Sequence, residues 1–229
     1  MIVMALVSPS AADPAPKTVA IDDLEGSAKL DALIERVVER QRALRTLEAE
    51  FVQLKESALL LDVVESTGRF LFRAPDLVRW DYRQPDSMVV LFAEDTVTTY
   101  HPAHARAERI KVSRKQRRFV RVLAGTQPLD DLTSHFSITL RDPGGQAHYR
   151  LTLRPVGNML SKKLQSVEIE VDRKLFLPVV IEYNEADGDS TRYEFKKMII
   201  NPEIDDSRFD LELGDDVKME TIDASAGVG

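Results

Sequence analysis

Cysteine is absent from the 229 residues, which excludes disulfides, thiol catalysis and thiolate metal sites. The lipid-attachment cysteine of a bacterial lipoprotein is missing for the same reason. Long apolar runs are also missing, since no segment after the first residues approaches the about 18 apolar residues of a membrane span. Basic residues are fewer than acidic residues, with 31 Lys and Arg and 38 Asp and Glu. This acidic excess argues against nucleic acid as a partner, because phosphate neutralisation needs a basic surface.

Catalytic motifs are equally scarce. The sequence has no G-x-S-x-G, P-loop or G-x-G-x-x-G motif. His101 and His104 could form a metal pair, but no carboxylate with ligand spacing lies near them, so both are interpreted as loop residues. The adjacent acidic pairs at 130–131, 205–206 and 215–216 diverge in extended structure and make poor catalytic dyads. We therefore expect no enzyme activity, no metal site and no cofactor.

The two ends of the sequence differ in composition from the middle. Residues 1–7 are apolar and residues 8–12 are mostly small, a pattern typical of the end of a secretory signal peptide. We interpret 1–26 as a signal-peptide remnant with a flexible leader, and we expect export. One domain is expected over 27–222, followed by a disordered tail at 223–229 that is rich in Ala and Gly.

A helix is predicted over 27–46. Ser27 is its candidate N-cap, and its apolar residues follow the helical repeat and form one stripe. These residues are Leu30, Leu33, Ile34, Val37, Val38 and Leu44.

From residue 47 onward the apolar residues recur every second position, which indicates strands with one dry and one wet face. Turn sequences separate them at 74–76, 84–86, 142–145 and 187–188, and such short connections make neighbouring strands antiparallel. About ten or eleven strands are predicted, enough for a barrel or a strongly curled sheet. The alternating segments lie near 48–53, 68–73, 78–82, 149–154, 167–172, 179–183, 193–196 and 209–213.

An amphipathic helix is predicted among the strands at 115–125. Phe119, Val120 and Leu123 form its apolar side, and the basic run at 114–118 is interpreted as a solvated face. Residues 128–135 are expected to add one more helical turn. The fold class is therefore mainly β (α+β), a single curved antiparallel sheet with amphipathic helices capping its concave face.

Four segments together resemble the outer-membrane lipoprotein carrier protein (LolA) family. Residues 68–85 are similar to its G-x-[FL]-x-[FV]-x-R-P-x-x-x-x-W-x-x-x-x-P core, and 51–53 to its F-x-Q. Residues 99–102 and 201–211 look like its W-x-Y-[ND]-P and its closing N-x-x-[VI]-x…F-x-F. The resemblance implies an unclosed half β-barrel with a helical lid over a hydrophobic cavity. It also implies a periplasmic protein that accepts lipoproteins from an inner-membrane ABC complex and passes them to an outer-membrane receptor.

One residue departs from the family pattern. The family has arginine directly before the proline, linked to lid closure and cargo release, whereas here Ala74 precedes Pro75 and the arginine is Arg73. A shift of one residue moves a strand side chain to the other face, so Arg73 is a candidate release arginine whose role is in question. Lipoprotein as the cargo is in question with it.

Large apolar and aromatic residues of one sheet face are the candidates for the cavity wall. An apolar face under a helix is more often a filled core, and only the family resemblance favours a cavity. The candidates are Phe51, Phe70, Phe72, Val78, Trp80, Tyr82, Leu91, Tyr100 and Tyr149, with Phe119, Val120 and Leu123 on the lid.

Three functions remain open at this point. The first is a monomeric periplasmic shuttle that shelters lipoprotein acyl chains. The second is a carrier of another lipid, such as a glycolipid intermediate for an envelope exporter. The third is a lipid-sensing module like the RseB relative of the family. The other relative, the receptor LolB, is itself a lipoprotein, so the missing cysteine counts against it.

Overall fold

The computed structural model describes residues 20–112 and 129–223, which form one long sheet and a single helix of more than four residues. The strands are β1 Thr46–Ser57, β2 Leu60–Arg73, β3 Leu77–Gln84, β4 Met88–Ala93, β5 Thr96–His101, β6 Arg106–Lys111, β7 Phe136–Arg141, β8 Tyr149–Pro155, β9 Leu164–Val171, β10 Pro178–Glu185, β11 Ser190–Ile200 and β12 Lys218–Asp223. The helical segments are α1 Gly26–Ala43, the single turns α3 Leu129–Leu132 and α4 Asn158–Ser161, and the 3-10 turns η1 Ile21–Asp23, η2 Pro102–His104 and η3 Asp206–Phe209.

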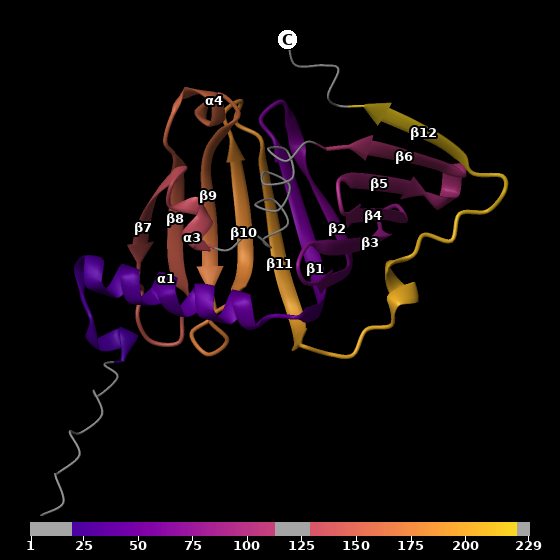
Figure 1. The fold of residues 1–229 in the computed structure, drawn as a ribbon. Helices are drawn as coiled ribbons and strands as arrows, with labels where there is room; N and C mark the ends of the chain where they lie inside the picture. Colours follow the sequence, from indigo (N-terminus) through magenta and orange to yellow (C-terminus); the bar gives the residue numbers. More distant parts are fainter. Residues whose placement is uncertain (1–19, 113–128, 224–229) are drawn as a thin grey trace, which may run out of the picture.

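The sheet is strongly curled but not closed. Its strand order is β12-β6-β5-β4-β3-β2-β1-β11-β10-β9-β8-β7, so β12 and β7 are separate edges. Figure 1 shows β7 to β11 standing upright while β3 to β6 and β12 lie across the view. The predicted mainly-β fold and the unclosed half-barrel are confirmed.

The far C-terminal strand departs from the expected antiparallel sheet. Strand β12 pairs in parallel with β6, from Lys218 opposite Arg106 to Asp223 opposite Lys111. Residues 201–217, which we call the C-terminal strap, carry the chain from β11 to this edge (Figure 1). A parallel neighbour needs such a long connection, which no local turn signal can reveal.

The strand expected at 209–213 does not form. Its first residue ends the 3-10 turn η3, and the remainder of the segment is irregular. The guanidinium of Arg79 on β3 donates hydrogen bonds to the backbone oxygens of Arg208 and Asp210, at 3.0 and 2.9 Å. These strap carbonyls are bonded by a side chain, so the alternation of Phe209, Leu211 and Leu213 does not indicate a strand here.

Helix α1 crosses the concave face over β7 to β11 (Figure 1). Leu33, Val37 and Val38 are buried on its inner side, as the apolar stripe predicts. The helix starts at Gly26 after Glu25, with no side-chain cap, so Ser27 is not the N-cap. It ends at Ala43 instead of 46, because the chain enters β1 at Thr46.

The turn expected at 128–135 is confirmed as α3. Leu129 and Leu132 are buried, and the amide of Leu129 donates to the Gln41 Oε1 of α1 at 3.0 Å. Arg42 of α1 also pairs with Asp130, with 2.5 Å between Nη2 and Oδ2. The helix expected at 115–125, with Phe119, Val120 and Leu123, lies outside the described residues. Across 20–112 and 129–223, no helix has the length and apolar character needed to span a membrane.

Candidate functional site

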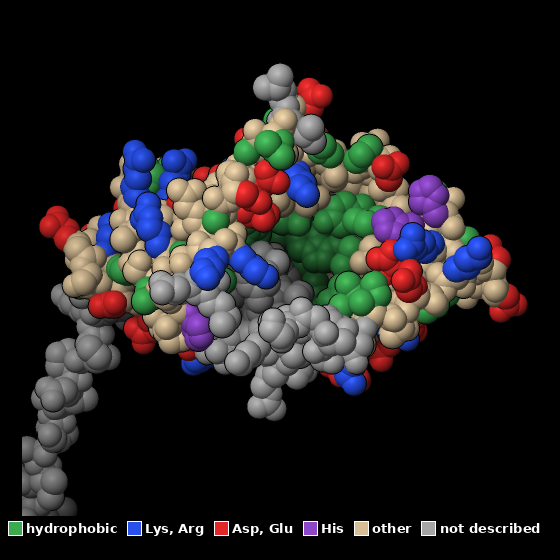
Figure 2. Space-filling model, turned by 90° about the horizontal axis from the view of Figure 1, so that it is seen from above, with side chains coloured by type: hydrophobic (Ala, Val, Ile, Leu, Met, Phe, Trp, Pro, Cys, Tyr) green, Lys and Arg blue, Asp and Glu red, His purple; other side chains and the backbone are tan. Residues whose placement is uncertain are grey.

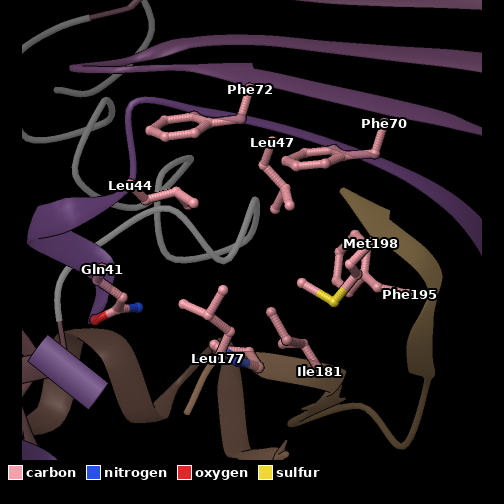
Figure 3. Close-up of a pocket in the computed structure, with 10 residues that line it drawn as sticks. Gln41, Leu44, Leu47, Phe70, Phe72, Leu177, Ile181, Phe195 and Met198 are labelled. Atoms are coloured by element: carbon pink, nitrogen blue, oxygen red, sulfur yellow. The ribbon is translucent and has the colours of Figure 1, made fainter. Parts of the chain in front are cut away.

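A pocket lies beside the connection between α1 and β1, on the concave face of the sheet (Figure 3). Its cavity volume is about 50 Å³, and the space among its lining side chains reaches about 510 Å³ when the open mouth is included. Nine of the ten lining residues are apolar, so the pocket suits hydrocarbon. The lining residues are Gln41, Leu44, Leu47, Phe70, Phe72, Leu177, Pro178, Ile181, Phe195 and Met198.

The upper wall in Figure 3 comes from paired residues of β1 and β2. Leu47 lies opposite Phe72 and Ala49 lies opposite Phe70, so these residues share one face of the sheet, and Leu47, Phe70 and Phe72 line the pocket. Leu44, just beyond the end of α1, points toward them (Figure 3). The connection from α1 to β1 therefore closes one end of the pocket.

Met198 reaches the pocket because of a bulge in β11. Pairing with β1 shifts between Glu48 opposite Ile199 and Glu50 opposite Lys196, and Lys197 adopts a left-handed φ of 50°. The extra residue resets the alternation, so Phe195 and Met198 face the same side although they are three positions apart. Strict alternation would direct Met198 outward, so the sequence pattern does not predict its place in the pocket.

Gly68 is required by the close packing above it. A Cβ on Gly68 would lie 2.1 Å from the backbone oxygen of Asp81 and 2.6 Å from Cε1 of Phe51. The Phe51 ring occupies the space that a side chain would need. The glycine of the 68–85 motif is therefore explained by the approach of an aromatic ring.

Trp80 is the centre of an aromatic wall that continues from the pocket. Its ring lies 4.8 Å from Phe51, 4.7 Å from Phe70, 4.9 Å from Tyr193 and 5.8 Å from Phe195, all between centroids. The closest pairs are edge-to-face, the arrangement that aromatic quadrupoles favour. The wall therefore joins four strands, β1, β2, β3 and β11, into one apolar surface.

Three polar side chains interrupt this wall. Gln53 Nε2 donates to the Tyr193 hydroxyl at 2.8 Å, and the Tyr193 and Tyr82 hydroxyls interact in turn. Burial is the main cause that raises the pKa of Tyr82 far above its usual value. Burial also raises the pKa of Tyr193, although the bonds from Tyr82 and Gln53 oppose it. Both phenols are therefore neutral hydrogen-bonding groups at physiological pH.

The structure brings together most of the candidate cavity residues. Six of them share one face and one apolar cluster, although only Phe70 and Phe72 line the pocket itself. The six are Phe51, Phe70, Phe72, Val78, Trp80 and Tyr82.

Three candidates lie elsewhere. Leu91 pairs with Arg79 and Tyr100 pairs with Val89, which places both on the opposite face of the sheet, so they do not belong to this wall. Tyr149 shares the concave face but is buried under α1 in a second cluster. Its hydroxyl donates to Asp22 Oδ1 at 2.6 Å, so it anchors η1.

Arg73 points away from the pocket, as the one-residue shift predicts, because its neighbour Phe72 faces inward. Its guanidinium donates to the Ile204 oxygen and to Asp206 Oδ1, both at 2.5 Å, and lies 4.8 Å from the Phe209 ring centroid. All three partners belong to the C-terminal strap. Arg73 therefore holds the strap on the outer face.

No group of three His, Cys, Asp or Glu side chains within the described ranges could hold a metal ion. Seen from above, Figure 2 shows a deep hollow lined by hydrophobic side chains. The apolar face is thus open to this side of the described molecule and is not fully covered by polar groups.

A sequence model of the outer membrane lipoprotein carrier protein LolA family matches residues 42–212, about three quarters of the chain. The chain belongs to the LolA family. The LolA match includes every pocket-lining residue except Gln41. A comparison with curated protein sequences gave no match.

Solved structures share the LolA fold at low identity. A protein from Thermus thermophilus is 12% identical, with a TM-score of 0.54 over 86% of this chain and 100% of that one. MucB is 16% identical, with a TM-score of 0.52 over 85% of this chain and 66% of MucB. A chain of the Pseudomonas aeruginosa MucA/MucB complex is 14% identical, with a TM-score of 0.49 over 83% and 63%. This chain therefore spans less than two thirds of these last two chains.

Proposed function

We propose that the protein is a periplasmic carrier that shelters the acyl chains of lipoproteins and moves them from the inner to the outer membrane. The apolar pocket on the concave sheet of a LolA-family chain is the observation that carries the proposal. Its role is to bind and release, without catalysis. As the family resemblance implies, the donor is an inner-membrane ABC complex and the acceptor is an outer-membrane receptor.

The energetics of an acyl chain explain why a carrier needs such a face. Each buried methylene is worth about 0.8 kcal/mol, so a chain of about 16 carbons holds on the order of 10 kcal/mol against water. The closed part of the pocket takes only a short apolar group, and the aromatic wall and the hollow of Figure 2 extend the apolar surface beyond it. We expect the end of the chain in the pocket and the rest along this wall.

Uptake of a fluorescent fatty acyl probe tests the proposal, using two glutamates placed on adjacent residues. Met198→Glu puts a charge into the apolar pocket, where desolvation is costly, so we expect affinity for the probe to fall at least about tenfold. Ile199→Glu is the matched control, because Ile199 is 54% exposed and faces away from the pocket. We expect its uptake to match the unmodified protein.

Circular dichroism and urea unfolding would show that both variants remain folded. Equal uptake by Met198→Glu, Ile199→Glu and the unmodified protein would rule out this pocket as the acyl site. Extraction of the purified protein followed by mass spectrometry identifies the cargo class. A lipoprotein acyl pattern supports the shuttle, whereas a glycolipid supports a carrier for an envelope exporter.

A second candidate is a lipid-sensing module that acts on a protein partner. The similarity to MucB favours it, since MucB has been solved in complex with MucA. A pull-down from an envelope extract separates the two functions. A regulator retains its protein partner when Met198→Glu blocks the pocket, whereas a shuttle loses its acylated cargo.

A further inference from the structure

Gln53, Tyr193 and Tyr82 form a hydrogen-bonding group within an otherwise apolar wall, and we call it the polar triad. Gln53 lies on β1, Tyr193 on β11 and Tyr82 on β3. Tyr82 and Tyr193 are separated in the sheet by two strands, β2 and β1. The curl of the sheet brings both rings against Phe51, whose centroid lies 5.0 Å from that of Tyr82 and 6.4 Å from that of Tyr193.

The triad has hydrogen-bond donors to spare. Gln53 donates one N–H to the Tyr193 oxygen, and the Tyr82 side chain lies close enough to Tyr193 to affect its pKa. Two phenols carry two protons, and a contact between their hydroxyls uses at most one of them. Among the described residues the other proton has no acceptor, and neither has the second N–H of Gln53. A ligand oxygen that reaches the triad would therefore find donors available to it.

The position of the triad relates it to the pocket. Tyr193 and Phe195 lie two residues apart on the same face of β11, a separation of about 7 Å. Phe195 lines the pocket, and its ring appears there in Figure 3. Trp80 contacts both rings, at 4.9 and 5.8 Å between centroids. An apolar chain can therefore run from the pocket to the triad without leaving aromatic surface.

Because its phenols are neutral, the triad is expected to bind a neutral ligand oxygen in preference to an anionic one. Burial is the largest cause of the raised pKa of both phenols, and no lysine or arginine of the described residues is among the causes. Within the described part of the chain, a carboxylate or phosphate at the triad would have no cation to balance it, which is unfavourable in an apolar setting. A neutral carbonyl needs only a donor.

We propose that the polar triad binds the ester or amide carbonyl that joins an acyl chain to its head group, with the hydrocarbon end of the chain directed into the pocket. This inference rests on the proposed function and adds a direction to it. The triad fixes which end of the cargo lies away from the pocket, and it distinguishes an acyl linkage from plain hydrocarbon.

Competition against a fluorescent acyl probe tests the inference with two matched ligands, methyl laurate and dodecyl methyl ether. They differ in the carbonyl oxygen. We expect the unmodified protein to bind the ester about fivefold more tightly, the effect of one net hydrogen bond. In the double variant Tyr82→Phe and Tyr193→Phe, this preference should disappear while binding of the ether is unchanged.

Tyr100→Phe is the control, because it removes a phenol from the opposite face of the sheet. It should keep the preference for the ester. If the ether binds but the ester is not preferred, or if the double variant keeps the preference, the triad does not bind the carbonyl and the carrier proposal survives. If neither ligand nor the probe binds the unmodified protein, the carrier proposal fails together with the inference.

Discussion

Asp142→Asn should destabilise the protein by removing the centre of an ion-pair cluster that ties α1 to the loops at one end of the sheet. Asp142 Oδ2 lies 2.6 Å from Lys29 Nζ of α1, and Oδ1 accepts hydrogen bonds from Arg173 and, at 2.9 Å, from the Gly144 amide. Arg173 also pairs with Asp22 of η1 at 2.7 Å. The Asp142 and Arg173 side chains are only 16% and 14% exposed, so solvent screens them weakly.

The pKa of Asp142 sets the size of the effect. Burial alone would raise it, but the bonds from Lys29, Gly144 and Arg173 together lower it from 3.8 to about 2. A shift of this size corresponds to about 2 kcal/mol of unfolding free energy. Because the folded pKa is depressed, this contribution is fully present above pH 3.8 and is lost as the pH falls through about 2.

Urea unfolding of the unmodified protein and of Asp142→Asn, repeated from neutral to acidic pH, measures the effect. The difference in unfolding free energy should be about 2 kcal/mol at pH 7 and should shrink toward zero near pH 2. Asp95→Asn is the control, since Asp95 faces Lys111 at 3.8 Å on the surface and such pairs contribute less than about 1 kcal/mol. A difference that stays constant with pH would refute the electrostatic reasoning.

Substitutions at three further positions have definite expected outcomes. Gly68→Ala would force its Cβ against the Asp81 oxygen and the Phe51 ring, so thermal unfolding should show a loss of about 1–3 kcal/mol. Lys197→Val should be less stable than Lys197→Gly by about 1–2 kcal/mol in urea, because a β-branched residue is strained at φ 50°. Arg73→Ala should release the C-terminal strap, which limited proteolysis would detect as faster cleavage within 204–210. Unchanged cleavage would contradict that role for Arg73.

Most strands were predictable from sequence because their alternation is local. The segments around Phe51 and Trp80 alternate, and each is a strand with those residues facing the core. Reliance on local alternation also assigned Leu91 to the wrong face of the sheet. Strand β4 is apolar on both sides, so its pattern does not say which side faces in, and only its pairing with β3 decides.

The candidate site was less predictable, because it depends on interruptions of the pattern. Met198 enters the pocket through a bulge whose only local mark is the left-handed Lys197, a residue type that gives no such signal. Leu177 and Pro178 lie where β10 begins, and their place across from Phe72 follows from the curl of the whole sheet. The segment around Phe209 shows the opposite case, because its residues alternate but do not form a strand. Its backbone oxygens accept hydrogen bonds from the Arg79 side chain and not from a neighbouring strand.

The separate edges β7 and β12 have a mechanical consequence for the whole molecule. A closed barrel has a fixed circumference, and enlarging it means breaking the backbone hydrogen bonds between two of its strands. In this sheet β12 and β7 are not paired with each other, so the two ends can move apart by additional twist while the hydrogen bonds between paired strands remain intact. For the proposed carrier, this predicts that the space between the two ends of the sheet can widen for a thicker cargo at the expense of side-chain contacts alone.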